Sequence, residues 1–274
     1  SKASNMRPPG ENLAKGEIVI TKGQVITPAL IGQLAASGTA QIEVARRLRV
    51  AVLSTGDEVV AAGSDAAHGQ IFDANRPMLK AMLQSNQIDV IDCGIVPDRL
   101  DALADAYEQA LQMADVVISS GGASDGIEDH SQQAMRQIGA SCAFWRLAMK
   151  PGRPLALGMW HGVPLFGLPG NPVAALVCAL VFARPALAQL AGAEWSIPQG
   201  FNVPAAFEKH KKAGRREYLR ARMRDGRAEV FASEGSGRIS GLSWAEGLVE
   251  LSEDARDIRA GDMVRFIPFG SFGL

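Results

Sequence analysis

The chain has 274 residues, of which 47% are hydrophobic and 21% are charged, as is typical of globular domains. This length exceeds what one ordinary core needs, so we expect two or three compact domains. The 28 lysine and arginine residues nearly balance the 29 acidic residues, which excludes the basic excess of most nucleic-acid-binding domains.

Cysteine usage and hydropathy predict a cytoplasmic protein with neither a membrane nor a nucleic-acid partner. Cys93, Cys142 and Cys178 lie far apart in apolar runs. They fit neither a zinc site nor a disulfide framework, so we expect buried, reduced thiols. The most apolar stretch, Val173 to Ala183, is shorter than the roughly 20 residues that span a bilayer. Residues 1–10 lack the apolar core of a signal peptide.

Residues 1–48 are predicted to contain small β elements and one short helix. Thr27 and Pro28 have the pattern of an N-cap followed by proline at the first helical position. An apolar stripe from Leu30 to Leu34 follows, and Gly38 is expected to end the helix. So small a segment cannot bury its own core, so we expect that it packs on another part of the molecule or is the tail of a domain whose start is absent.

Residues 49–193 alternate between predicted strands and helices. Val50 to Leu53 is a continuous apolar run, as expected of a strand that is covered on both faces. The elements that follow are a helix capped by Asn75, a strand at 90–91, a helix over 100–111, a strand at 116–118 and a capped helix over 129–138. This order predicts an α/β domain with a mainly parallel sheet wrapped by helices.

The remaining elements complete this domain and add a second one. Residues 155–167 are predicted to form two short strands, and a long helix is predicted to begin at Asn171-Pro172 and to end near Arg184-Pro185. Residues 194–274 are predicted to form a small all-β, barrel-like domain, because short strands there alternate with Gly-rich turns. Those strands are expected at 201–207, 218–223, 228–232, 248–251 and 263–267.

Four loops of the predicted α/β domain lie where ligands of open sheets collect, outside the carboxyl ends of the strands. They span residues 54–58, 69–75, 119–126 and 167–172. In the last two, glycines allow backbone N–H groups to approach an anion, and a helix N-terminus follows. A Gly-rich loop can instead be a simple tight turn. Two such loops in one sheet favour binding of a phosphate or another oxyanion.

Cations and carboxylates accompany these loops. If residues 142–149 are extended, Arg146 and Lys150 point to the same face, although a solvated edge is the alternative. Acidic side chains fall near predicted strand ends or a helix start at Asp57, Glu58, Asp73, Asp98 and Asp129. Carboxylates beside an anion site commonly hold Mg²⁺, whereas N-capping is a strong alternative for Asp129. The residues alone therefore predict Mg²⁺-assisted chemistry on a phosphorylated small molecule.

Taken together, these loops resemble those of the molybdopterin molybdenumtransferases and the related gephyrin E domain. The motifs that carry this resemblance span residues 50–58, 69–76, 115–122, 150–154 and 167–173. Residues 7–49 resemble the segment that precedes the family's catalytic domain. Residues 214–222, 235–237 and 260–262 resemble its terminal β domain.

The resemblance implies that Mg²⁺ assists the insertion of molybdate into adenylated molybdopterin, with release of AMP. By motif position it implies that Glu58, Asp98 and Asp129 are catalytic, metal-handling carboxylates. It also implies that Lys150 is catalytic and, with Arg146, binds the anionic substrate, molybdate or phosphate. The other substrate-binding residues that it implies are Gly56, Asp57, Asp73, Asn75, Ser120, Gly121, Gly122, Ser124, Gly126, Pro151, Gly152, Pro169, Gly170, Asn171 and Pro172.

The chain departs from the family pattern in two places. Asp125 stands where a small or apolar residue is common, and Arg146 stands where lysine is common, which keeps the charge but changes its geometry. Family members carry a further N-terminal part that includes most of an elongated domain. The resemblance therefore implies that residues 1–48 are the remnant of that domain and that the chain is a fragment.

The resemblance also implies partners and leaves two alternative functions open. Family members are dimers in which the further N-terminal part completes the partner's active site. One implied partner is therefore a second copy of the chain. The other partner that the resemblance implies is molybdopterin adenylyltransferase. The alternative functions are a single-domain molybdopterin adenylyltransferase and a non-catalytic, gephyrin-like scaffold.

Overall fold

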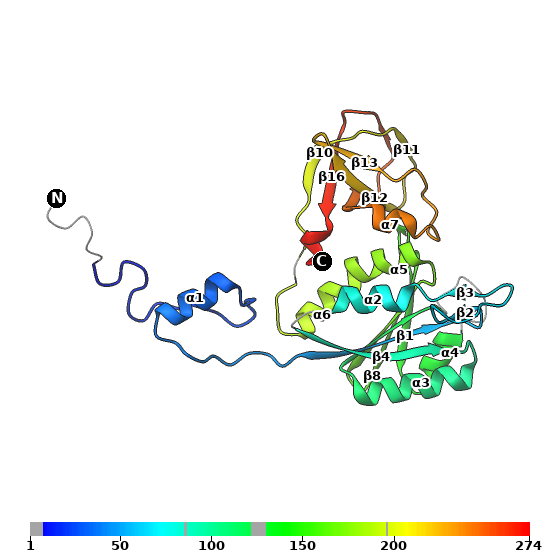
Figure 1. Ribbon diagram of the computed structural model, residues 1–274, viewed down its shortest axis with the longest axis horizontal. Helices are drawn as coiled ribbons and strands as arrows, with labels where there is room; N and C mark the ends of the chain where they lie inside the picture. The colour runs from blue at the N-terminus through cyan, green and yellow to red at the C-terminus, as the bar shows by residue number, and fades with distance from the viewer. Residues whose placement is uncertain (1–7, 85–86, 122–129, 196) are drawn as a thin grey trace.

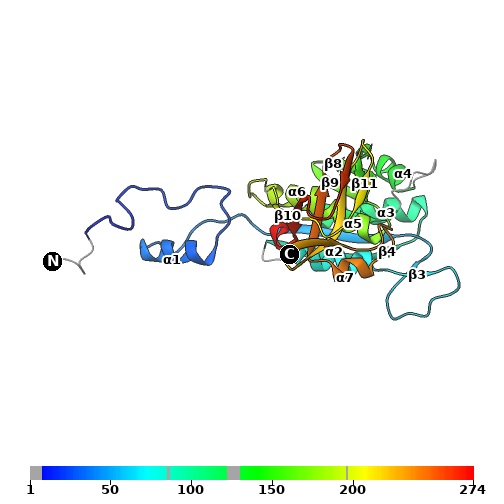
Figure 2. The same ribbon diagram turned by 90° about the horizontal axis from the view of Figure 1, so that it is seen from above.

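The computed structural model describes residues 8–84, 87–121, 130–195 and 197–274. The chain forms an amino-terminal arm, a layered α/β part and a carboxy-terminal β part (Figure 1). The arm extends away from the other two parts, and Figure 2 shows the same separation from above.

The α/β part is built on a six-stranded sheet of order β4-β1-β5-β9-β8-β6. Its strands are β1 (Leu48–Thr55), β4 (Ile88–Val96), β5 (Val116–Ser120), β6 (Ser141–Arg146), β8 (Pro154–Trp160) and β9 (Val163–Leu168). Neighbours among β4, β1, β5 and β9 are parallel, whereas β8 pairs antiparallel with both β9 and β6. The predicted α/β fold with a mainly parallel sheet is confirmed.

Helices cover both faces of this sheet (Figure 1), and this explains why β1 is apolar along its length. Val50 and Val52 belong to one core, which they share with α2 (Asn75–Leu83) and with the helix that follows β9. Ala51 and Leu53 belong to the opposite core, which they share with α3 (Leu100–Met113) and α4 (His130–Gln137). Because successive side chains point to opposite faces, burial on both faces requires a continuous apolar run.

The helix that follows β9 is longer than predicted. It comprises α5 (Pro172–Cys178), a π-helical turn (Ala179–Ala183) and α6 (Arg184–Leu190). The predicted end near Arg184-Pro185 is wrong, because the π-helical turn changes the hydrogen-bond spacing just before a proline that cannot donate.

The helix that follows β9 is longer than the apolar stretch from Val173 to Ala183, whose shortness led to the prediction that no segment spans a membrane. Among the described residues, Pro172–Leu190 is long and apolar enough by length and composition alone to cross a membrane. Most of this helix is buried inside the molecule, where its side chains belong to a core that β1, α2 and residues of the β part share. A helix buried in this way is a core helix. Its packing, and not its length, therefore argues against a membrane span.

Ion pairs fix α2 to β4. Arg76 Nη1 lies 2.6 Å from Asp92 Oδ1, and Lys80 Nζ donates a hydrogen bond to Asp92 Oδ2. Burial alone would raise the pKa of Asp92, but hydrogen bonds from Lys80, the Gly94 N–H and Arg76 outweigh burial and lower this pKa to about 2. The ionised carboxylate therefore stabilises the fold above the pKa of about 3.9 that an unfolded Asp has. That stabilisation is lost as the pH falls through about 2.

We expect Asp92→Asn to lower the thermal unfolding midpoint at pH 6 and to do so by a smaller amount at pH 3. The expected loss at pH 6 is about 1 kcal/mol, because the carboxylate is partly exposed and solvent screens its ion pairs. Asp89→Asn on the same strand is the matched control, because its carboxylate pairs with Arg47 at 3.0 Å but is 51% exposed. An equal loss at both pH values for Asp92→Asn contradicts the expectation.

The β part contains a five-strand path of order β10-β16-β14-β12-β13 and a separate pair, β11-β15. Its strands are β10 (Phe201–Pro204), β11 (Lys209–Lys211), β12 (Arg216–Arg224), β13 (Arg227–Val230), β14 (Gly247–Leu251), β15 (Arg256–Ile258) and β16 (Met263–Pro268). The five predicted strands are present. β11, β15 and two short helices, α7 (Ser240–Trp244) and a 3-10 turn (Phe269–Phe272), were not predicted.

One short strand joins the two parts. β7 (Met149–Lys150) leaves the α/β sheet and pairs parallel with β12 of the β part. The condition under which Arg146 and Lys150 would point to the same face, one extended segment over residues 142–149, is therefore not met. The chain leaves the sheet after Arg146, and the Leu147 N–H then donates to the Arg153 carbonyl at 2.7 Å.

The amino-terminal arm contains α1 (Pro28–Ala36) with Thr27 as its N-cap, as predicted. The predicted β elements do not occur in residues 8–47 of the structure. At the end of the arm, Arg46 pairs through both terminal nitrogens with Asp115, at 2.6 and 2.8 Å. This pair anchors the arm to the amino-terminal end of β5.

Candidate active site at the carboxyl ends of the strands

The parallel pairing of β1, β5 and β9 brings their last residues to one edge of the sheet. Ser54 is the register partner of Ser120, and Ser120 is the partner of Leu168. All three are buried. The loops that leave these strands therefore begin side by side, as expected for a ligand site of an open α/β sheet.

Asn75 links these loops, although it was predicted to be a helix cap. The helix begins at Asn75, and the Asn75 Nδ2 group donates to Ser120 Oγ and to the Gly170 carbonyl, each at 2.7 Å. The capping contact comes instead from Asp73, whose Oδ1 accepts from the Arg76 N–H at 3.1 Å. The cap was misassigned because Asn75 reaches a strand that lies far away in the sequence.

Gly121 allows the third loop to approach the first one closely. Its φ is +100°, and a Cβ atom at this position would overlap the Thr55 carbonyl oxygen. Next to it, Ser120 Oγ donates to the Pro169 carbonyl at 3.3 Å. These contacts bind the ends of β1, β5 and β9 into one rigid cluster, which we call the strand-end cluster.

Two buried oxygens of the strand-end cluster have no hydrogen-bond partner within the described ranges. They are Thr55 Oγ1 and Asn75 Oδ1. A buried polar atom without a partner costs about 1–3 kcal/mol. Such atoms are therefore expected where a ligand completes the hydrogen bonds.

The carboxylates lie beside this cluster, at the end of β4. The Asp98 N–H donates to Asp57 Oδ1 at 2.9 Å, and His130 Nδ1 lies 3.5 Å from Asp98 Oδ1. Asp98 Oδ1 is itself buried and accepts no hydrogen bond from the part of the chain that the structure describes. Gly56 follows β1, and Glu58 is exposed just before β2 (Val59–Val60), which pairs with β3 (Ile71–Phe72).

The fit of these residues to a divalent cation is partial. The Asp57 carboxylate contacts the backbone N–H of Asp98, and both residues carry oxygen ligands of the kind that Mg²⁺ prefers. Residues 8–84, 87–121, 130–195 and 197–274 contain no group of three or more acidic, histidine or cysteine side chains placed to hold a metal ion. Asp129, predicted to complete the set, lies outside the described residues, as do Gly122, Ser124 and Gly126.

The predicted cations lie at the same edge of the sheet. Arg146 is exposed at the carboxyl end of β6, which runs in the same direction as β9 because both strands pair antiparallel with β8. Lys150 Nζ lies 2.5 Å from Glu234 Oε2. Pro151 lines a pocket beside Lys150.

Of the remaining predicted residues, Gly152 packs against α5, and Asn171 and Pro172 lie at its start. Gly152 is buried with a φ of +94°, and a Cβ atom there would overlap the Cys178 sulfur. Asn171 and Pro172 occupy the N-cap and first positions of the helix, but the Asn171 side chain makes no capping hydrogen bond.

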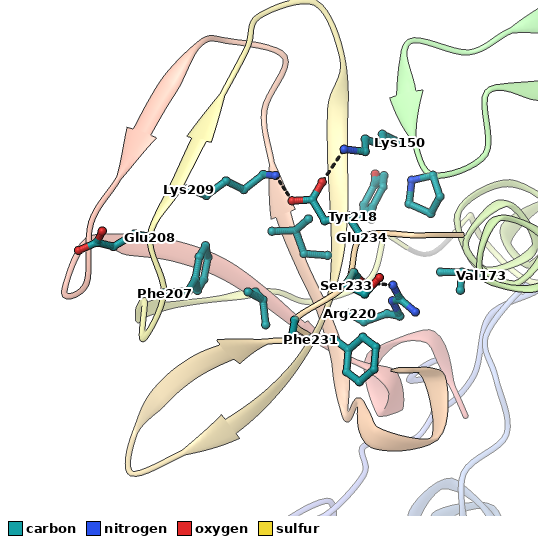
Figure 3. A pocket seen from close by; sticks show the side chains of 14 residues that line it. Lys150, Val173, Phe207, Glu208, Lys209, Tyr218, Arg220, Phe231, Ser233 and Glu234 are labelled. Atoms are coloured by element: carbon teal, nitrogen blue, oxygen red, sulfur yellow. Dashed lines mark hydrogen bonds and ion pairs between the residues drawn. The ribbon is translucent and has the colours of Figure 1, made fainter. Parts of the chain in front are cut away.

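A pocket of about 260 Å³ lies between the α/β part and the β part (Figure 3). Lys150, Pro151 and Val173 line it from one side, and β-part residues that include Lys209 and Glu234 line it from the other. The sequence did not single out Lys209 and Glu234. The one signal in the sequence is that they lie near the motifs that resemble the terminal β domain. The pairing of β7 with β12 brings them to Lys150, and no local sequence pattern predicts that pairing.

The chain matches two family models. Residues 51–189 match the model described as "Probable molybdopterin binding domain", and residues 202–269 match "MoeA C-terminal region (domain IV)".

Similar proteins and structures agree with these matches. The chain is 35% identical over 271 residues to the molybdopterin molybdenumtransferase of Haemophilus influenzae, covering 97% of the chain and 67% of that protein. It is 32% identical to molybdopterin molybdenumtransferase 2 of Mycobacterium tuberculosis, covering 95% of the chain and 66% of that protein.

A crystal structure of the molybdopterin biosynthesis MoeA protein from Pyrococcus horikoshii superposes with a TM-score of 0.82 at 27% identity. The match covers 95% of the chain and 64% of the archaeal one. The chain thus spans about two thirds of the length of these relatives.

Proposed function

Because the chain belongs to the molybdopterin molybdenumtransferase family, we propose that it inserts molybdate into adenylated molybdopterin and releases AMP. The strand-end cluster carries this proposal. Its buried Thr55 and Asn75 oxygens have no protein partner among the described residues, so a polar ligand that docks there completes their hydrogen bonds. In an ordinary packed turn, buried oxygens have hydrogen-bond partners within the protein.

Five of the predicted residues have a role in this proposal. Ser120 and Gly121 hold the substrate against the strand ends, and Asn75 keeps the Gly170 loop in register with them. Lys150 and Arg146 bind the anionic groups, which are molybdate or a phosphate of the nucleotide. Fixed cations and N–H donors stabilise charge that develops when the phosphoanhydride bond is cleaved.

We also propose that Glu58, Asp98 and Asp129 would hold Mg²⁺, a set that the resemblance implies and of which Asp129 lies outside the described residues. The buried Asp98 Oδ1, which has no hydrogen-bond partner among the described residues, supports this assignment, and the Asp57 carboxylate holds the Asp98 backbone N–H beside it. When bound, Mg²⁺ supplies a positive charge that neutralises the phosphate oxygens of the leaving AMP. His130, near Asp98, fixes the orientation of that loop.

The proposal extends to partners and compartment. We expect a homodimer, because the resemblance places part of each active site on a second copy. A molybdopterin adenylyltransferase is expected to supply the adenylated substrate. We expect these proteins to meet in the cytoplasm.

An AMP-release assay tests the proposed function. The protein is incubated with adenylated molybdopterin, and AMP is quantified by chromatography with molybdate and Mg²⁺ added together, separately or not at all. We expect release only when both are present. Release that needs no molybdate contradicts the proposal. Synthesis of the adenylate from molybdopterin and Mg-ATP contradicts it as well and supports the adenylyltransferase alternative.

A further inference from the structure

Glu234 lies between two lysine ammonium groups in the pocket that separates the α/β part from the β part (Figure 3). Its Oε2 is 2.5 Å from Lys150 Nζ, and its Oε1 accepts a hydrogen bond from Lys209 Nζ. Each oxygen of the carboxylate thus accepts from a different lysine. The side chain occupies the position in which a small anion would meet both cations.

The carboxylate is accessible from the pocket. The Glu234 side chain is 44% exposed and that of Lys150 is 37% exposed, whereas Lys209 is only 12% exposed. Glu217 fixes Lys209 from the other side, at 3.1 Å. Lys209 is therefore held in place by a second carboxylate while Glu234 borders solvent, so a rotation of the Glu234 side chain alone frees both cations from it.

The backbone that carries Glu234 is fixed. The buried Arg220 guanidinium donates to the carbonyls of Ser233, Gly235 and Arg238. The Val173 N–H, at the start of α5, donates to the Ser236 carbonyl at 3.0 Å. The loop therefore presents the Glu234 side chain to Lys150 in one defined arrangement.

Glu234 is ionised near neutral pH. Burial alone would raise the pKa of its carboxyl, but hydrogen bonds and charge from Lys150 and Lys209 outweigh burial and lower this pKa below its ordinary value. The pocket thus holds a permanent negative charge at the position of its two converging cations.

We propose that Glu234 is an internal competitor, which occupies the position of a tetrahedral oxyanion between Lys150 and Lys209 until the substrate displaces it. The inference rests on the proposed function, in which Lys150 binds an anionic group of the substrate. A carboxylate and a tetrahedral oxyanion present similar acceptor oxygens to two ammonium groups. A monoanion that displaces the carboxylate brings the same negative charge to the two lysines. A dianion brings one negative charge more and is attracted more strongly. Glu234 thereby restricts the site to multiply charged anions.

Isothermal titration calorimetry of the whole chain with E234Q tests this role. Molybdate and inorganic phosphate are titrated separately, so that the two sources of a tetrahedral oxyanion are distinguished. We expect E234Q to bind at least one of them about tenfold more tightly than the wild type, because the anion no longer has to break two ion pairs. Glu234→Ala must show the same gain, which guards against a contact made by the new amide.

Glu229→Gln is the matched control. Its carboxylate also belongs to the β part, is 37% exposed and pairs with Arg222 at 2.9 Å, but it does not line the pocket. We expect its oxyanion affinity to equal that of the wild type. Thermal unfolding confirms that each variant is folded before titration.

The outcomes separate this inference from the proposed function. A gain for molybdate alone or for phosphate alone supports the competitor role and identifies the anion. Equal affinity in the wild type and E234Q, together with lost binding in Lys150→Ala, overturns the inference and leaves the proposed function intact. If no variant binds either anion, the competitor role and the anion-binding role of Lys150 are both wrong, and the AMP-release assay then decides the function independently.

Discussion

Lys150→Ala is expected to lower the rate of AMP release by about 100- to 1,000-fold. Removal of one fixed donor or cation from a site where negative charge develops has typical effects of this size. Lys150 is the predicted anion-binding residue that the structure places at the pocket between the two parts. Its neighbour Lys209 is already engaged by Glu217 and Glu234 and is not expected to replace it.

The measurement is single-turnover release of AMP at saturating molybdate and Mg²⁺. Lys212→Ala is the control, because Lys212 is an exposed lysine of the β part that does not line the pocket. Its rate is expected to match the wild type. A Lys150→Ala rate within a few-fold of the control shows that the pocket is not the reaction site.

Gly121→Ala is expected to lower the thermal unfolding midpoint by about 10 °C, which corresponds to roughly 3 kcal/mol in a domain of this size. An L-residue at its φ of +100° is strained, and the new Cβ would overlap the Thr55 carbonyl oxygen. That carbonyl belongs to the buried strand β1, so it cannot move away without disturbing the core.

Gly139→Ala separates the two causes. Gly139 also has a positive φ, +79°, but a Cβ atom there meets nothing within 4 Å. This control carries the backbone strain without the overlap, so we expect it to lower the midpoint by only about 2–4 °C. Equal losses for both variants contradict the close approach of the third loop to the first.

The α/β fold was predictable because it depends on local patterns. Apolar runs such as Val50 to Leu53 require burial on both faces, and the parallel order of strands then places their ends together. The strand-end cluster follows from that order. Its four loops were therefore expected at one edge of the sheet, and the structure joins them through Ser120, Gly121 and Asn75.

Contacts between distant segments were not predictable. Asn75 looked like a cap because its partners, Ser120 and the Gly170 carbonyl, are distant in the sequence. The helix was predicted to end near Pro185 because no local sequence pattern predicts a π-helical turn. Glu234 was not singled out, because its position beside the 235–237 motif does not reveal that the pairing of β7 with β12 brings the β part to Lys150.

Binding of adenylated molybdopterin to Thr55→Val, measured by calorimetry beside the wild type, tests the central claim most directly. Valine has nearly the shape of threonine and removes the buried Thr55 hydroxyl that has no partner among the described residues. The variant is therefore expected to be at least as stable as the wild type. If the strand-end cluster binds the substrate, the wild type binds it saturably and Thr55→Val binds it about tenfold more weakly. Equal affinity for both proteins, or no binding by either, would contradict the assignment of the substrate site to the strand ends.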